Sequence, residues 1–112
     1  MAIETEKLRR LSIALPMDAI ATFCERWKVR EFALFGSVLR EDFRPAESDI
    51  DVLVTLEDPA TVSLFDLVEM EQQLQAIFAR RVDMVERGGV EQNPNPFVRI
   101  PILETVRVVY AR

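Results

Sequence analysis

Two aspartates, Asp49 and Asp51, are separated by a single residue in an otherwise apolar stretch, and this spacing suits the binding of a metal ion. Alternate side chains of a β-strand point to the same face, so the two carboxylates would share one face. The apolar side chains would then occupy the other face: Ile50, Val52 and Val54. Neighbouring carboxylates repel each other unless a cation or protons neutralise them. The pattern therefore predicts a strand that binds metal.

A glycine–serine pair precedes the aspartates, at the end of an apolar run. Gly36 and Ser37 directly follow Phe32-Ala33-Leu34-Phe35. Glycine lets the backbone approach a phosphate closely, and Ser37 can cap a short helix whose N–H groups would point at the turn. By itself, such a pair could be an ordinary turn between a strand and a helix. Together with the aspartates, it predicts a phosphate-binding turn.

A third acidic residue, Asp83, lies within the apolar run over residues 81–85. We expect this run to form a strand beside the one that carries Asp49 and Asp51, where Asp83 could face the same pocket. An ordinary aspartate at the end of a strand is the alternative. The sequence does not fix the register of the two strands, so both interpretations stay open at this point.

The composition of the chain excludes several kinds of catalytic site and metal site. The chain has no histidine and one cysteine, Cys24, which excludes a Ser-His-Asp triad, a histidine base, a histidine-containing zinc site and an internal disulfide. Carboxylate oxygens suit hard ions, so Mg²⁺ or Mn²⁺ is the expected metal. The net charge of −5 argues against broad nucleic-acid binding, which requires a basic face.

The length of 112 residues predicts one domain over residues 1–112. Apolar residues make up 49% of the chain and charged residues 29%, a balance that fits a globular domain rather than a disordered tail. No apolar run approaches the ~20 residues of a membrane span. The first residues also lack the basic and apolar segments of a signal peptide. We therefore expect a cytoplasmic protein.

Hydrophobic periodicity predicts helices and strands that alternate along the chain. Helices are expected over residues 16–28, 63–79 and 97–104, with a short one after Ser37 and further helical spacing at Leu8, Leu11 and Leu15. Strands are expected over residues 32–35, 50–56, 81–85 and 106–110, with a polar loop over 41–48 and Gly88-Gly89 ending the third strand. Cys24 and Trp27 are expected in the core. The alternation predicts an α/β (α+β) fold with helices packed on one face of a sheet.

The motifs in this order resemble the signature of the polymerase-β-type nucleotidyltransferase superfamily. They are Gly36-Ser37, then Asp49-Ile50-Asp51, then Arg81-Val82-Asp83-Met84-Val85. The chain is most similar to the minimal nucleotidyltransferase (MNT) family, roughly from Pro16 to Tyr110. This resemblance implies a small mixed β-sheet, a polymerase-β-like nucleotidyltransferase fold, whose open face carries the active site.

The resemblance also implies roles for single residues. The catalytic and metal-binding set would be Asp49, Asp51 and Asp83, holding two Mg²⁺ ions, with Asp83 helping to deprotonate the acceptor. The nucleotide-binding set would be Gly36, Ser37 and Arg40, with ATP as the substrate. Arg40 could instead be a solvated surface residue. Many superfamily members have a glycine after this arginine, whereas Glu41 follows it here, which leaves the loop geometry and the nucleotide preference open.

Many MNT proteins are antitoxins of HEPN-domain toxins. The resemblance thus implies an Mg²⁺-dependent nucleotidyltransferase that transfers AMP from ATP to a tyrosine hydroxyl of a partner HEPN ribonuclease and neutralises it. A fold of about one hundred residues leaves little chain to grip an acceptor, so the partner would be the acceptor. A small-molecule nucleotidyltransferase and a non-catalytic antitoxin that acts by binding are the alternatives. Three phenylalanines could contact the partner or pack internally: Phe43, Phe65 and Phe97.

Overall fold

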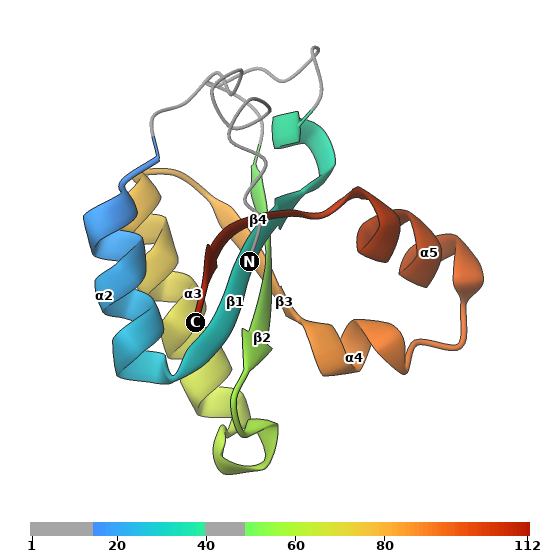
Figure 1. The fold of residues 1–112 in the computed structure, drawn as a ribbon, viewed down its shortest axis with the longest axis horizontal. Helices are drawn as coiled ribbons and strands as arrows, with labels where there is room; N and C mark the ends of the chain where they lie inside the picture. The colour runs from blue at the N-terminus through green and yellow to red at the C-terminus, as the bar shows by residue number, and fades with distance from the viewer. Residues whose placement is uncertain (1–14, 40–48) are drawn as a thin grey trace.

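A four-stranded mixed sheet forms the centre of the molecule (Figure 1). The computed structural model describes residues 15–39 and 49–112. The strands are β1 (Val29–Phe35), β2 (Ile50–Leu56), β3 (Val82–Glu86) and β4 (Arg107–Ala111), in the order β3-β2-β1-β4. β1 pairs antiparallel with β2 and with β4, whereas β2 and β3 are parallel. A parallel pair needs a crossover connection, which the helix between β2 and β3 supplies.

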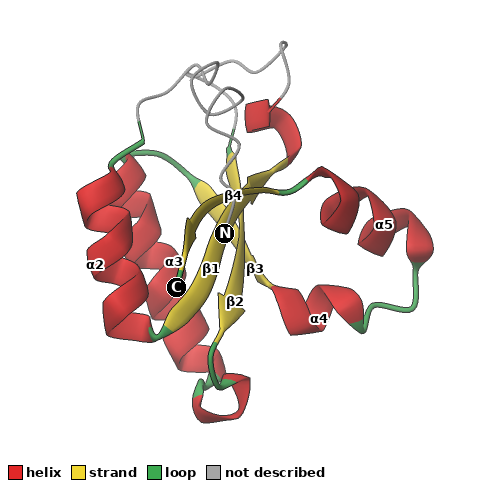
Figure 2. Ribbon diagram, viewed as in Figure 1, coloured by secondary structure: helices red, strands yellow, loops and turns green. Residues whose placement is uncertain are grey.

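Two helices, α2 (Met17–Trp27) and α3 (Leu64–Phe78), cover one face of the sheet, as Figure 2 shows. The apolar stripe of α2 places Ile20 and Cys24 in the core on this side, and Trp27 packs against that core while its indole N–H donates to Gln73 Oε1 at 2.9 Å. A capping box at Ser63 begins α3. The expected core position of Cys24 is confirmed, whereas Trp27 is half-buried at the edge of that core.

The other face of the sheet is partly covered by α4 (Arg87–Glu91) and α5 (Pro96–Thr105). A second, smaller apolar cluster forms here around Ala33, Leu53 and Val90. The small mixed sheet with packed helices agrees with the prediction, but the helices lie on both faces rather than on one. Gly88-Gly89 follows the third strand as expected, yet both glycines lie inside α4, because the Glu86 side chain accepts the Gly89 N–H and caps a helix there.

The bounds of most elements agree closely with the periodicity. β2 matches the predicted strand residue for residue, and α2, α3, α5, β3 and β4 differ from prediction by one residue at each end. β1 begins three residues earlier than expected, because pairing with β2 and β4 extends it. Leu8, Leu11 and the predicted loop over residues 41–48 lie outside the described residues. No described helix is both long enough and apolar enough to span a bilayer.

Candidate active site

Asp51 and Asp83 lie directly opposite each other on the parallel strands β2 and β3. Paired residues of adjacent strands point to the same face, about 4.8 Å apart between strands. On either side of Asp51, Ile50 and Val52 are fully buried on the face that α2 and α3 cover, so Asp51 points to the other face. Asp51 is half-buried and Asp83 is exposed. The register that the sequence left open therefore brings these two carboxylates together.

Asp49 lies just before β2 and is paired with a cation. The Asp49 Oδ2 atom is 3.7 Å from Arg81 Nε, with side chains that are 39% and 75% exposed. The backbone supports this neighbourhood, because the Ile50 N–H donates to the Arg81 carbonyl at 3.0 Å. An exposed ion pair of this kind contributes little to stability. Its effect is local, since it places one positive charge beside a group of carboxylates.

Gly36 closes the site on the side of β1. It begins the short helical turn η1 (Gly36–Leu39) with φ of +74°, a conformation that disfavours residues with a Cβ. A Cβ built on Gly36 would collide with the carboxylate of Asp51. Phe35, the preceding residue, is the register partner of Asp51. The turn therefore favours glycine for two reasons: its backbone conformation, and the room it leaves for the end of the Asp51 side chain.

The donor set fits a metal that arrives with a phosphate ligand. Among residues 15–39 and 49–112, no three acidic, histidine or cysteine side chains converge closely enough to hold a metal ion together. Asp51 and Asp83 supply a pair of carboxylates on one face, with Asp49 held towards Arg81. Mg²⁺ in proteins is commonly bound by one or two carboxylates together with substrate phosphates and water. These residues could hold Mg²⁺ in that way, rather than in a cage made of protein alone.

The other predicted residues have separate outcomes. Ser37 follows Gly36 within η1, at the place that the sequence indicated. Arg40 and Phe43 lie outside the described residues. Phe65 and Phe97 are each 87% exposed, so the expectation of internal packing is wrong for both, and contact with a partner stays a prediction.

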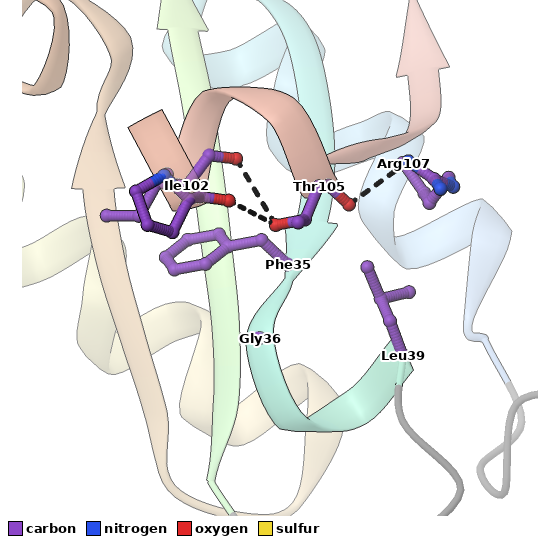
Figure 3. Close-up of a pocket in the computed structure, with 7 residues that line it drawn as sticks. Phe35, Gly36, Leu39, Ile102, Thr105 and Arg107 are labelled. Carbon is purple, nitrogen blue, oxygen red and sulfur yellow. Dashed lines mark hydrogen bonds between the residues drawn. The ribbon is translucent and has the colours of Figure 1, made fainter. Parts of the chain in front are cut away.

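Sequence reasoning missed Arg81 and the residues that α5 brings to the site. Arg81 precedes Asp83 by two residues, the same alternation that relates Asp49 to Asp51, and this signal could have placed it beside Asp49. Thr105 and Arg107 line a cavity next to Gly36 (Figure 3), and nothing in the sequence pattern indicates this contact. It depends on how α5 folds back over the sheet.

The sequence of this chain matches a known protein family and several known proteins. Residues 17–109 match the family described as "Nucleotidyltransferase domain". A protein of Methanocaldococcus jannaschii, provisionally named a protein adenylyltransferase, is 35% identical over 80 residues, which cover 71% of this chain and 76% of that protein.

Solved structures share the fold. A provisionally assigned minimal nucleotidyltransferase aligns with a TM-score of 0.61 at 29% identity, covering 95% of this chain and 94% of that one. A complex of tri-AMPylated HEPN toxin from Shewanella oneidensis with MNT antitoxin aligns with a TM-score of 0.59, covering 87% of this chain and 71% of that chain. At 19% identity, the second likeness concerns the fold alone.

Proposed function

The chain belongs to the nucleotidyltransferase-domain family, and on that premise we propose that it is a protein adenylyltransferase that serves as the antitoxin of a toxin–antitoxin pair. Its substrate is ATP, and its acceptor is a tyrosine hydroxyl of a partner HEPN ribonuclease, which the added AMP inactivates. The M. jannaschii relative, named for protein adenylylation, and the AMPylated HEPN toxin bound to an MNT antitoxin support this proposal.

The single observation that carries the proposal is the register of Asp51 and Asp83, with the Gly36 turn against Asp51. Asp83 is exposed on β3, at the edge of the described sheet, where a hydroxyl on another protein can reach it. A shielded pocket would instead favour a small acceptor. The geometry thus favours a macromolecular acceptor over the small-molecule alternative.

The proposed reaction assigns a task to each residue. Asp83 accepts the proton of the acceptor hydroxyl. The oxygen of that hydroxyl bonds to the α-phosphorus at the same time, and the bond from the α-phosphorus to the pyrophosphate oxygen breaks. Asp49, Asp51 and Asp83 would supply carboxylate oxygens for two Mg²⁺ ions, which when bound would provide the positive charge that offsets the triphosphate. Gly36 lets the phosphates approach the backbone, and Ser37 and Arg40 bind them, as the family resemblance implies.

The test combines the purified chain, Mg²⁺, ATP and a candidate HEPN-domain partner, sought first in the product of the neighbouring gene, and measures intact masses. The HEPN protein should gain one or more AMP units with the wild-type chain and none with Asp51→Asn or Asp83→Asn. Asp58→Asn is the matched control, because Asp58 is exposed beyond the opposite end of β2 and its side chain caps nothing.

Each outcome decides the proposal. Transfer that survives in both site variants would refute the assigned residues. A stable complex without a change of mass would instead establish an antitoxin that acts by binding. Transfer to small hydroxylated compounds in the absence of the HEPN protein would establish the small-molecule enzyme.

A further inference from the structure

Arg81 and Asp49 form a pair of opposite charges one step before the facing aspartates of β3 and β2. The Ile50 N–H donates to the Arg81 carbonyl, so Arg81 and Asp49 lie side by side where the two parallel strands begin. Alternate residues of a strand point to the same face, so this pair lies on the face that carries Asp51 and Asp83. The site therefore contains three carboxylates and one guanidinium, which we call the charged quartet: Asp49, Asp51, Arg81 and Asp83.

The contact between Arg81 and Asp49 is loose. The distance of 3.7 Å between Arg81 Nε and Asp49 Oδ2 is longer than a charge-assisted hydrogen bond, which measures about 2.7–2.9 Å. The Arg81 side chain is 75% exposed and that of Asp49 is 39% exposed, so water screens the attraction between them. Arg81 can therefore leave Asp49 at little cost in free energy when a stronger partner is present.

A metal ion at the carboxylates would conflict with this pair. Under the proposed function Asp49 supplies oxygens to Mg²⁺, and the Arg81 guanidinium lies next to those oxygens. Two cations within about 6 Å of each other repel even in water. In the nucleotide-free chain, Arg81 therefore competes with a metal ion for Asp49 and weakens the binding of that ion.

The nucleotide would offer Arg81 a stronger partner than Asp49. Because the acceptor oxygen that Asp83 deprotonates bonds to the α-phosphorus, the α-phosphate would lie beside Asp83. Arg81 precedes Asp83 by two residues on the same face, about 6–7 Å along the strand, and its long side chain can cover that distance. A planar guanidinium donates two parallel N–H bonds to phosphate oxygens, which is a stronger contact than an exposed ion pair.

We propose that Arg81 exchanges partners, an inference that rests on the proposed function: it neutralises Asp49 in the free chain and binds the phosphates of the nucleotide once metal and nucleotide are present. In the free chain the three carboxylates of the charged quartet repel one another, and Arg81 offsets part of that repulsion. In the loaded site the excess negative charge is that of the triphosphate, which Arg81 then offsets. The exchange makes the affinity for metal depend on the nucleotide.

Substitution of Arg81 should change two affinities in opposite directions. In about 0.15 M salt, Arg81→Gln should bind free Mn²⁺ about three- to tenfold more tightly than the wild-type chain does, as measured by electron paramagnetic resonance. In Mg²⁺ it should bind AMP-PNP about tenfold more weakly, as measured by calorimetry. Arg81 is exposed, so the variant should fold normally, which circular dichroism melting checks.

Arg26→Gln is the matched control for these two affinities. Arg26 of α2 forms a similar exposed pair with Glu69 of α3, at 3.9 Å, and these helices cover the face opposite the charged quartet. Salt screens charges at that separation. Arg26→Gln should therefore leave both affinities within about twofold of the wild-type values.

The side-chain N–H of Arg81 separates a contact with phosphate from a change in the electric field. In a chain labelled with ¹⁵N-arginine, the Arg81 Nε–H signal is identified by its absence from Arg81→Gln. Its exchange with solvent should slow about tenfold or more when Mg²⁺ and AMP-PNP bind to the wild-type chain, because a hydrogen-bonded N–H is protected from exchange. An unchanged exchange rate would overturn the exchange of partners.

The failures of the two proposals can be distinguished. Affinities for Mn²⁺ and AMP-PNP that stay unchanged in folded Arg81→Gln, or that both fall, overturn the exchange of partners, and AMP transfer by the wild-type chain then leaves the proposed function standing. A wild-type chain that binds no AMP-PNP and transfers no AMP overturns the proposed function, and the exchange of partners with it.

Discussion

Replacing Gly36 by alanine would test both reasons for glycine at the site. Alanine at φ of +74° costs about 1–2 kcal/mol of stability, partly offset by about 0.4–1 kcal/mol from a less flexible unfolded chain. The new Cβ would also collide with the Asp51 carboxylate, which must move away from Gly36 to relieve the overlap. Holding the displaced Asp51 side chain off its preferred rotamer adds about 0.5–1.5 kcal/mol, so we expect a total loss of about 2 kcal/mol, or a Tm lower by roughly 5–10 °C in a chain of this size.

The effect on AMP transfer should exceed the effect on stability. A shift of about 1 Å in a group that holds the reacting atoms can cost about a hundredfold in rate. At a temperature where Gly36→Ala is fully folded, we therefore expect transfer to the HEPN protein to fall by about that factor. Circular dichroism melting and intact-mass time courses would measure the two quantities on the same preparations.

A matched glycine and a double variant isolate the cause. Gly89→Ala should leave Tm unchanged or slightly raised and transfer intact, because an added Cβ at this helical position meets no atom within 4 Å apart from its chain neighbours and the backbone of its own helix. In an Asp51→Ala background the collision is absent, so Gly36→Ala should cost only the backbone strain. Equal losses of stability in both backgrounds would refute the contact with Asp51, and full transfer by Gly36→Ala would refute its place in the site.

Three other perturbations have definite outcomes. Ser63→Ala removes the hydroxyl that accepts the Asp66 N–H at 3.1 Å, and thermal melting should show a loss of about 1 kcal/mol; an unchanged Tm would contradict the capping box. Asp83→Asn removes the repulsion between the carboxylates of Asp83 and Asp51, so Tm without metal should rise by roughly 1–4 °C; a lower Tm would contradict this repulsion. Burial raises the pKa of the Cys24 thiol from 9.0 to about 12. The folded chain then keeps a proton that the unfolded chain loses, so the free energy of unfolding should fall as pH rises from 9 towards 12. Urea titrations at pH 8 and pH 10 would show this fall, and Cys24→Ala should abolish it.

The elements that sequence predicted best are those whose local pattern and tertiary surroundings agree. Every second residue of β2 from Ile50 to Leu56 is buried, so its apolar face, and the opposite face that carries Asp51, could be assigned from period alone. α3 has a capping signal at Ser63 and a long apolar stripe, and its bounds followed from these.

What the sequence could not provide depends on contacts between distant segments. The register that sets Asp51 against Asp83 is fixed by the α3 crossover, and the pairing of Arg81 with Asp49 follows from it. The sequence did not predict helices on the second face of the sheet. α5 is mostly exposed, contains Pro101 and has only a weak apolar stripe, so its local sequence does not indicate that it packs on the sheet. The cavity at Gly36 is a consequence of that packing.

Under the proposed function, the position of β3 at the edge of the described sheet would limit the fraction of molecules that are competent for AMP transfer. β3 is five residues long and, among the described strands, pairs with β2 alone, and the Glu71 carboxylate in α3 accepts the Met84 N–H at 3.0 Å. A short edge strand held by one neighbour opens at a lower free energy than the whole domain. Each opening carries Asp83 away from Asp51 while the remaining three strands stay folded. Warming should therefore open β3 and abolish AMP transfer at a temperature below the Tm of the domain. Amide hydrogen exchange over residues 82–86 would measure that opening directly.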